Sequence, residues 1–170
     1  NQKKTRVGSP LRLKFLGFTL GVSKGEAYAR PHKVAKERIK QALKLITKRN
    51  RGVSVGTIFS DIKRKMRGWL QYYGIGRMKN FLKSLDAWLR TRIRQYIWKS
   101  WKKVKTKFKN LRKLGESVSE ARIFANTRKG YWYTAHTGVL KYTLTNEKLE
   151  RLGLLNLSEA FQYIQERLNY

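Results

Sequence analysis

The sequence predicts a mainly α-helical protein, in which a β-hairpin precedes a three-helix bundle and a small helical domain follows it. Apolar residues recur with a period of 3.6 over three long segments, 32–49, 55–73 and 77–103. Glycines and turn residues separate these segments. Hydrophobic residues make up 41% of the 170-residue chain, which is enough for a folded core.

The hairpin is expected within the first thirty residues. Alternating apolar residues from Leu11 to Leu20 are typical of a strand, and Ser23-Lys24-Gly25-Glu26 is typical of a turn before a short return strand, 27–29. Arg30-Pro31 then favours the start of a helix, with the proline in the first turn, where an N–H is not needed.

The first long helix, 32–49, has two faces of opposite character. Its apolar stripe consists of Ala35, Ile39, Ala42, Leu43 and Ile46, and its opposite face carries Lys33, Lys36, Lys40, Lys44 and Lys48. Like charges four residues apart cost about 0.2–0.5 kcal/mol per pair in an isolated helix, and only Glu37 offsets them. Phosphates would relieve this repulsion, so we favour a phosphate-binding ladder for the set, although a solvated face is the simpler interpretation of any single lysine.

The second helix, 55–73, can be capped by Ser54, and the third, 77–103, follows breaks at Gly74 and Gly76. The second stripe comprises Val55, Ile58, Phe59, Ile62, Met66, Trp69, Leu70 and Tyr73, and the third comprises Met78, Phe81, Leu82, Leu85, Leu89, Ile93 and Tyr96. Gly68 lies outside the apolar stripe of the second helix. It indicates either that another backbone or an RNA strand approaches closely there, or that the helix simply tolerates a destabilising glycine. Trp98 and Trp101 suit either base stacking or, as we favour, a second core.

The C-terminal part contains shorter helices. Ser117 and Glu120 form a capping box for a helix ending near Asn126, and a loop follows through 128–138. Asn146 can cap a helix that ends at Gly153, and Ser158 can cap the last one, 159–168.

The charge is strongly positive and unevenly distributed. The net charge is +30, and residues 1–114 hold 33 Lys and Arg against 4 Asp and Glu, whereas residues 115–170 hold 7 against 6. A charge of this size favours a polyanionic partner, either nucleic acid or an anionic membrane. No apolar run approaches the roughly 20 residues of a membrane span, and the aromatic residues recur at helical spacing, so we favour nucleic acid.

The residues needed for a catalytic centre are missing from this sequence. Two-metal phosphoryl transfer needs converging carboxylates, but the four acidic residues of the basic part are widely spaced. His32 and His136 lack partners for a metal site, cysteine is absent, and no glycine-rich phosphate loop occurs. We therefore expect no catalytic residues, metal or cofactor in this segment.

Several short motifs, taken in order, resemble group II intron reverse transcriptases of bacteria. Phe15-Leu16-Gly17-Phe18, Arg30-Pro31 and Gly68-Trp69 with Tyr72-Tyr73 are similar to the end of that family's palm and its thumb. The later runs resemble its maturase region; they are 98–103, Leu114-Gly115, 125–132 and Leu144-Thr145-Asn146 with Leu149 and Leu152-Gly153. The match covers about residues 13–157, and its specificity comes from the order and spacing of the motifs.

The resemblance implies three regions: the end of the palm with its hairpin at 1–30, the thumb at 31–103 and the maturase domain at 104–170. Family members bind their intron RNA, promote its splicing and copy it into DNA during retrohoming, in the bacterial cytoplasm. The implied partners are intron RNA, the RNA template–DNA primer duplex and the remaining fingers and palm. The paired metal-binding aspartates of the palm are not in this chain, so Mg²⁺ is expected to serve the implied polymerase and the RNA. We expect the chain to be a piece of such a protein.

The candidate RNA-binding residues are the basic side chains of the first and third helices, with neighbouring cations and the loop at 128–133. They are Lys33, Lys36, Lys40, Lys44, Lys48, Arg49, Arg51, Arg64, Arg67, Arg90, Arg94, Lys99, Lys102, Lys103, Lys105, Lys107, Arg128, Lys129, Tyr131 and Trp132. For Arg128, Tyr131 and Trp132, RNA recognition and a packed turn are equally open. The resemblance assigns Leu16 and Gly17 to support of the primer end.

Three other functions are compatible with the composition. A structural RNA-binding protein of the ribosomal kind would not require the ordered motifs. An active polymerase would extend a primer with Mg²⁺, which this segment alone should not do. A fragment of a DNA-binding recombinase would prefer duplex DNA to folded RNA.

Overall fold

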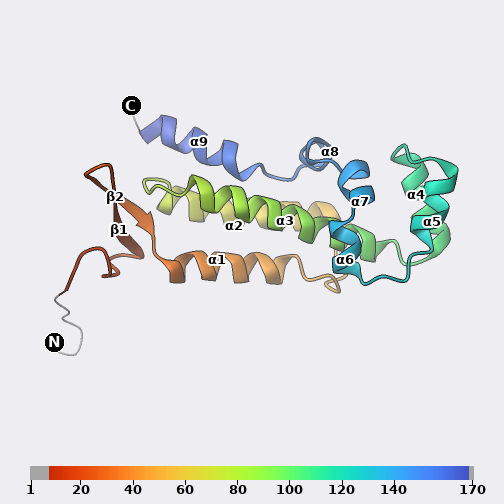
Figure 1. Cartoon of the computed structure of the whole chain (residues 1–170), viewed down its shortest axis with the longest axis horizontal. Helices are drawn as coiled ribbons and strands as arrows, with labels where there is room; N and C mark the ends of the chain where they lie inside the picture. The colour runs from red at the N-terminus through yellow and green to blue at the C-terminus, as the bar shows by residue number, and fades with distance from the viewer. Residues whose placement is uncertain (1–7, 169–170) are drawn as a thin grey trace.

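The fold is mainly helical with a two-stranded hairpin before the helices, as the sequence predicted. A computed structural model describes residues 8–168. Three long helices, α1 (Lys33–Ile46), α2 (Val55–Tyr73) and α3 (Lys79–Ser100), run along the long axis of the molecule (Figure 1). The hairpin lies at one end of this bundle, and α4 (Val104–Lys113) and α5 (Val118–Ala125) lie at the other (Figure 1).

The hairpin pairs β1 (Phe18–Ser23) with β2 (Glu26–Pro31) in antiparallel register. Lys24 and Gly25 both have positive φ, as a two-residue turn with the twist of a hairpin requires. The expected strand from Leu11 to Leu20 is wrong in its first part, because the chain already reverses at Leu16 and Gly17. These two residues also have positive φ, and Phe15 and Phe18 exchange backbone hydrogen bonds across them.

The long helices begin close to the predicted positions. Ser54 caps α2 by accepting a hydrogen bond from the Thr57 N–H, as predicted. Pro31 is not in the first turn of α1; it ends β2 opposite Phe18, and His32 caps the helix instead. The third helix is shorter than predicted, because the chain breaks at Trp101 before α4.

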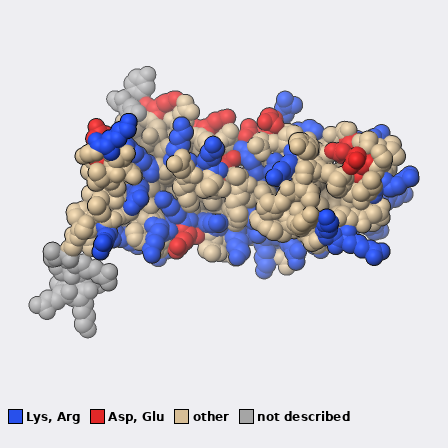
Figure 2. All heavy atoms as spheres, viewed as in Figure 1, with Lys and Arg blue, Asp and Glu red and all other residues tan. Residues whose placement is uncertain are grey.

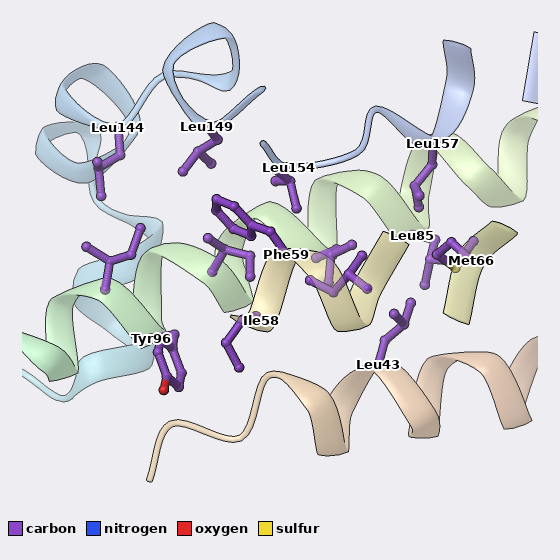
Figure 3. Packing of buried hydrophobic residues seen from close by; sticks show 14 of the residues in the cluster. Leu43, Ile58, Phe59, Met66, Leu85, Tyr96, Leu144, Leu149, Leu154 and Leu157 are labelled. Carbon is purple, nitrogen blue, oxygen red and sulfur yellow. The ribbon is translucent and has the colours of Figure 1, made fainter. Parts of the chain in front are cut away.

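The three predicted apolar stripes form the core. Leu43 of α1, Ile58 and Met66 of α2 and Leu85 of α3 point toward one another, and all are buried (Figure 3). Trp98 is also fully buried and Trp101 packs against the same cluster. Core packing of these two tryptophans is therefore confirmed, but they belong to the one apolar cluster and not to a separate second core.

The C-terminal part packs along α3 and shares this core. Its helices are α5, α6 (Tyr131–His136), α7 (Gly138–Thr143), α8 (Asn146–Arg151) and α9 (Leu157–Leu168). The structure places α6 and α9 against α3, and Leu149, Leu154 and Leu157 belong to the same apolar cluster as Phe59 (Figure 3).

Local details of this part differ from the prediction. The Ser117 cap is confirmed, since its hydroxyl accepts from the Glu120 N–H. The expected loop at 128–138 is interrupted by α6. Thr145, not Asn146, caps α8, and Asn156, not Ser158, accepts hydrogen bonds from the first N–H groups of α9. In each case several adjacent residues can cap, so the sequence does not select among them.

Candidate nucleic-acid interface

The lysine ladder, which we define as Lys33, Lys36, Lys40, Lys44 and Lys48, lies along the outer side of α1. All but Lys36 are exposed. The Lys36 ammonium lies 5.2 Å from the centre of the Phe81 ring, and that of Lys40 lies 5.3 Å from the Trp88 ring. Partial burial, together with nearby Arg30, lowers the pKa of Lys36. The aromatic rings of α3 therefore hold two cations of the ladder close to α3.

No carboxylate of residues 8–168 forms an ion pair with the lysine ladder. Within residues 8–168, ion pairs are formed only by arginines, namely Arg51, Arg64, Arg77 and Arg90. No lysine of this part of the chain has a carboxylate within 4 Å. The repulsion along α1 is therefore relieved only by solvent and salt, or by an external anion.

A cationic pocket of about 490 Å³ opens where α1 ends against α3. Its charged walls are Lys44, Lys48, Arg49 and Arg92, and the amides of Gln41, Asn50 and Gln95 complete it. No acidic residue lines this pocket. Four cations and three amides can all donate hydrogen bonds, so the pocket suits an anion.

Arg92 is fixed in this pocket by the end of α1. Its guanidinium donates to the Thr47 hydroxyl at 3.0 Å and to the backbone carbonyls of Lys44 and Thr47 at 3.0 and 3.1 Å. Burial lowers the pKa of Arg92, and no carboxylate offsets that burial. Sequence reasoning missed this residue, because the helical period alone did not show that it faces α1 while Arg90 and Arg94 face away.

Tyr131 joins α6 to the same end of the bundle. The Arg49 guanidinium lies 5.2 Å from the centre of its ring, and the Lys99 ammonium lies 4.9 Å from it. The ring is half-buried and packs against the core. The position of Tyr131 agrees with the packed-turn interpretation. Within residues 8–168, neither Arg49 nor Lys99 forms an ion pair with a carboxylate.

Arg90 and Arg94 are buried in protein, at 4% and 5% exposure. Arg90 donates to Asp86 at 2.5 Å and to Glu150 at 2.6 Å. Although burial alone would lower the pKa of Arg90, these bonds raise it. Arg94 donates to the Leu144 carbonyl at 2.9 Å and to the Asn146 side chain at 3.0 Å. The two arginines tie the segment around α8 to α3, so we do not retain them as candidate RNA contacts.

The remaining predicted residues are distributed over three places. Arg51 and Arg64 both pair with Asp61. Arg67 is exposed on α2. Around the α3–α4 junction lie exposed Lys102, Lys103 and Lys105 and half-buried Lys107, whose ammonium is 4.6 Å from the Trp98 ring. At α6, Arg128, Lys129 and Trp132 are exposed, and the Lys129 ammonium lies 4.6 Å from the Tyr133 ring.

The Leu16-Gly17 turn is held by the end of α2. The Tyr72 hydroxyl donates to the Leu16 carbonyl at 2.9 Å, and a Cβ at Gly17 would lie 2.4 Å from the Tyr73 hydroxyl. Gly17 is thus required both by its φ of 81° and by this contact. At Gly68, by contrast, apart from its chain neighbours and the nearby backbone of its own helix, no atom of the described chain lies within 4 Å of the position of a Cβ, so no approach of another backbone explains that glycine.

The two long edges of the molecule differ in charge. Acidic side chains gather along the edge formed by α8 and α9, whereas the opposite edge, formed by α1, is predominantly basic (Figure 2). Lysines and arginines also occur on the face between them (Figure 2). One acidic cluster interrupts the positive charge on the α1 edge (Figure 2).

Two searches of residues 8–168 concern other kinds of site. No group of three or more His, Asp or Glu side chains is arranged to hold a metal ion in this part of the chain. None of the helices there combines the length and the apolar character that crossing a membrane requires.

The comparison with protein families gives one match. Residues 36–115 match the model of the group II intron, maturase-specific domain. No curated protein matches the chain. The matched segment runs from α1 to the end of α4, and so includes most of the lysine ladder, the cationic pocket and the α3–α4 junction. The match over residues 36–115 supports a group II intron maturase C-terminal region and a role in group II intron splicing.

Proposed function

We propose that the chain promotes splicing by binding group II intron RNA through the phosphate backbone, along the lysine ladder and into the cationic pocket. The observation that carries this proposal is the absence of any carboxylate within 4 Å of a lysine in the described chain. Phosphate contacts supply most of the sequence-independent affinity of nucleic-acid-binding proteins, and they fix the protein's position on its ligand.

The cationic pocket supports the same proposal by its construction. Arg92 is held in place by three acceptors at the end of α1 before any ligand arrives. Because its side chain is ordered, little conformational entropy is lost when it binds a phosphate. A phosphate oxygen would also supply the negative charge that the partly buried guanidinium lacks.

Charge reversal on the ladder tests the proposal. We expect Lys40→Glu with Lys44→Glu to weaken binding to the intron RNA by about tenfold or more, because two contacts are lost and two repulsive charges are added. The matched control is Arg151→Glu with Arg167→Glu, which changes the charge equally at two exposed positions on α8 and α9. Equal losses in both double variants would show that only net charge matters, and would contradict a ladder-specific site.

The splicing reaction provides the second readout. The ladder variant should lose maturase-dependent splicing at RNA and protein concentrations where the control variant retains it. A circular dichroism spectrum unchanged from that of the unaltered protein must accompany this loss. If the ladder variant keeps its fold and still promotes splicing, the ladder is not the site.

We also propose that this region serves an intron-encoded reverse transcriptase, in which it contacts the template–primer duplex. The hairpin end supports this proposal, since Phe15 is 76% exposed and an apolar groove of about 600 Å³ lies between Phe15, Leu16, Leu20 and Ile75. The palm of a reverse transcriptase would cover such a surface. Primer extension with Mg²⁺ should be absent for this chain alone and should appear when a fingers–palm polypeptide is added; no gain on addition would contradict the proposal.

A further inference from the structure

A second pocket, of about 750 Å³, lies between α3 and the segments of α6 to α8. Its walls differ in kind from those of the cationic pocket, because they include the aromatic rings of Trp88, Trp132 and His136. We call it the aromatic pocket. Its polar groups include Lys83, Lys141 and Glu147.

Trp132 is the unusual residue of this pocket. The buried residues of α6 are Thr134 and Ala135, and Trp132 is 41% exposed. His136 orients it from one side: the two ring centres are 4.5 Å apart at an interplanar angle of 70°, and the His136 Nδ1 lies 2.9 Å from the Trp132 carbonyl. The indole is therefore positioned by its own helix while much of its surface stays open to a ligand.

The aromatic pocket has carboxylates that the cationic pocket lacks, beside the cations Lys83, Arg90, Arg94 and Lys141. Asp86 and Glu147 both line it, and the Asp86 carboxylate is engaged by Arg90. Hydrogen bonds from its own backbone N–H and from Thr145 lower the pKa of Glu147, so that side chain remains an acceptor near neutral pH. A carboxylate repels a phosphate but accepts hydrogen bonds from the N–H groups on a base edge.

The aromatic pocket adjoins the lysine ladder through Trp88. This residue lines the pocket, and the Lys40 ammonium and the Arg92 guanidinium lie 5.3 and 5.7 Å from the centre of its ring. An RNA strand whose phosphates lie on the ladder would therefore pass directly beside the pocket.

We infer that the aromatic pocket receives one unpaired RNA base, which stacks on Trp132 while Lys83 and Lys141 contact the neighbouring phosphates. This inference rests on the proposed binding of intron RNA and adds to it the class of RNA element that is recognised. Unpaired bases in loops and bulges are available for stacking on aromatic side chains, whereas paired bases are not.

The test uses an RNA hairpin with a single bulged adenosine, the same hairpin with an abasic bulge, and a fully paired hairpin. The unaltered protein should bind the bulged adenosine more tightly than the other two. Removal of a stacking aromatic typically weakens binding by about 5- to 150-fold per base, so Trp132→Ala should reduce the affinity for the bulged adenosine by a factor in this range and abolish the preference. The Trp132→Phe protein should retain part of the preference for the bulged adenosine.

Tyr163→Ala is the matched control, because Tyr163 is an exposed aromatic residue of α9 that also lies beside a cation, Arg167. It should leave the preference unchanged. With 2-aminopurine in place of the bulged adenosine, the unaltered protein should quench its fluorescence and the Trp132→Ala protein should not.

The outcomes separate the two proposals. Salt-dependent binding of all three hairpins with no preference for the bulged base would contradict base binding in the aromatic pocket. It would leave the proposed phosphate interface unaffected. If the Trp132→Ala protein keeps the preference for the bulged adenosine, base stacking on Trp132 would also be contradicted. No binding to any hairpin or to the intron RNA would overturn both.

Discussion

The cations along α1 and those on the α8 side of α3 look alike in sequence but differ in the acceptors available to them. Within residues 8–168 the lysine ladder has no carboxylate within 4 Å, whereas Arg90 has two and Arg94 has a carbonyl and an amide oxygen. Arg92 lies between these arginines in sequence, yet it faces the ladder. The comparison teaches that burial within the protein, and not the density of positive charge, separates Arg90 and Arg94 from the cations that we propose to bind RNA.

The largest expected effect on stability is that of Arg90→Ala. This change leaves Asp86 and Glu150 without their partner at a partly buried site, and breaking such a pair costs about 3–5 kcal/mol. Urea denaturation should show this loss in the free energy of unfolding. A loss well under 1 kcal/mol would mean that Arg90 does not anchor α8 to α3.

Arg94→Ala should have a smaller effect of the same kind. The Leu144 carbonyl and the Asn146 side chain lose a donor, which costs about 1–3 kcal/mol for buried groups. The change should leave the salt dependence of RNA binding unaltered for the protein that remains folded. A reduced salt dependence would return Arg94 to the interface.

Arg92→Ala should affect both properties. It removes a donor from the last carbonyls of α1, at a cost of about 1 kcal/mol, and it removes the fixed cation of the cationic pocket. We expect the RNA affinity of the Arg92→Ala protein to fall about threefold to tenfold. Arg92→Lys should restore the positive charge but not the forked hydrogen-bonding geometry of the guanidinium. If Arg92→Ala lowers stability but leaves RNA affinity unchanged, Arg92 has a structural role like that of Arg90 and Arg94.

Lys44→Ala should change stability least. Exposed substitutions usually stay within about 0.5 kcal/mol, and removal of a repulsive charge from the ladder can even stabilise α1. Its affinity for intron RNA should nevertheless fall, as measured by filter binding under the conditions used for Arg92→Ala. Unchanged affinity would place Lys44 among the merely solvated lysines.

The sequence predicted the elements whose signal is local and periodic. Stripes of period 3.6 identified the three long helices and their core residues, and the Ser54 and Ser117 caps were identified by residue type and position. Leu16 was misassigned to a strand because a positive φ at a leucine has no signature in residue type. The short helices α6 and α7 were missed, because six residues are too few to display a helical period.

The candidate interface was only partly predictable. The ladder could be read from one helix, because its charge pattern lies within a single element. The burial of Arg90 and Arg94 depends on which side of α3 meets α8, and their partners there lie 50 to 60 positions away in sequence. The cationic pocket likewise combines two helices, so no local pattern could have identified it.

The salt dependence of binding to the group II intron RNA tests the central claim most directly. The affinity of the unaltered protein should fall steeply with salt, and the double variant of Lys40→Glu and Lys44→Glu should flatten the logarithmic slope by about two, or roughly one unit for each lost phosphate contact. The Arg151→Glu and Arg167→Glu control should keep the slope of the unaltered protein. An unchanged slope in the ladder variant would remove α1 from the RNA interface and contradict the account.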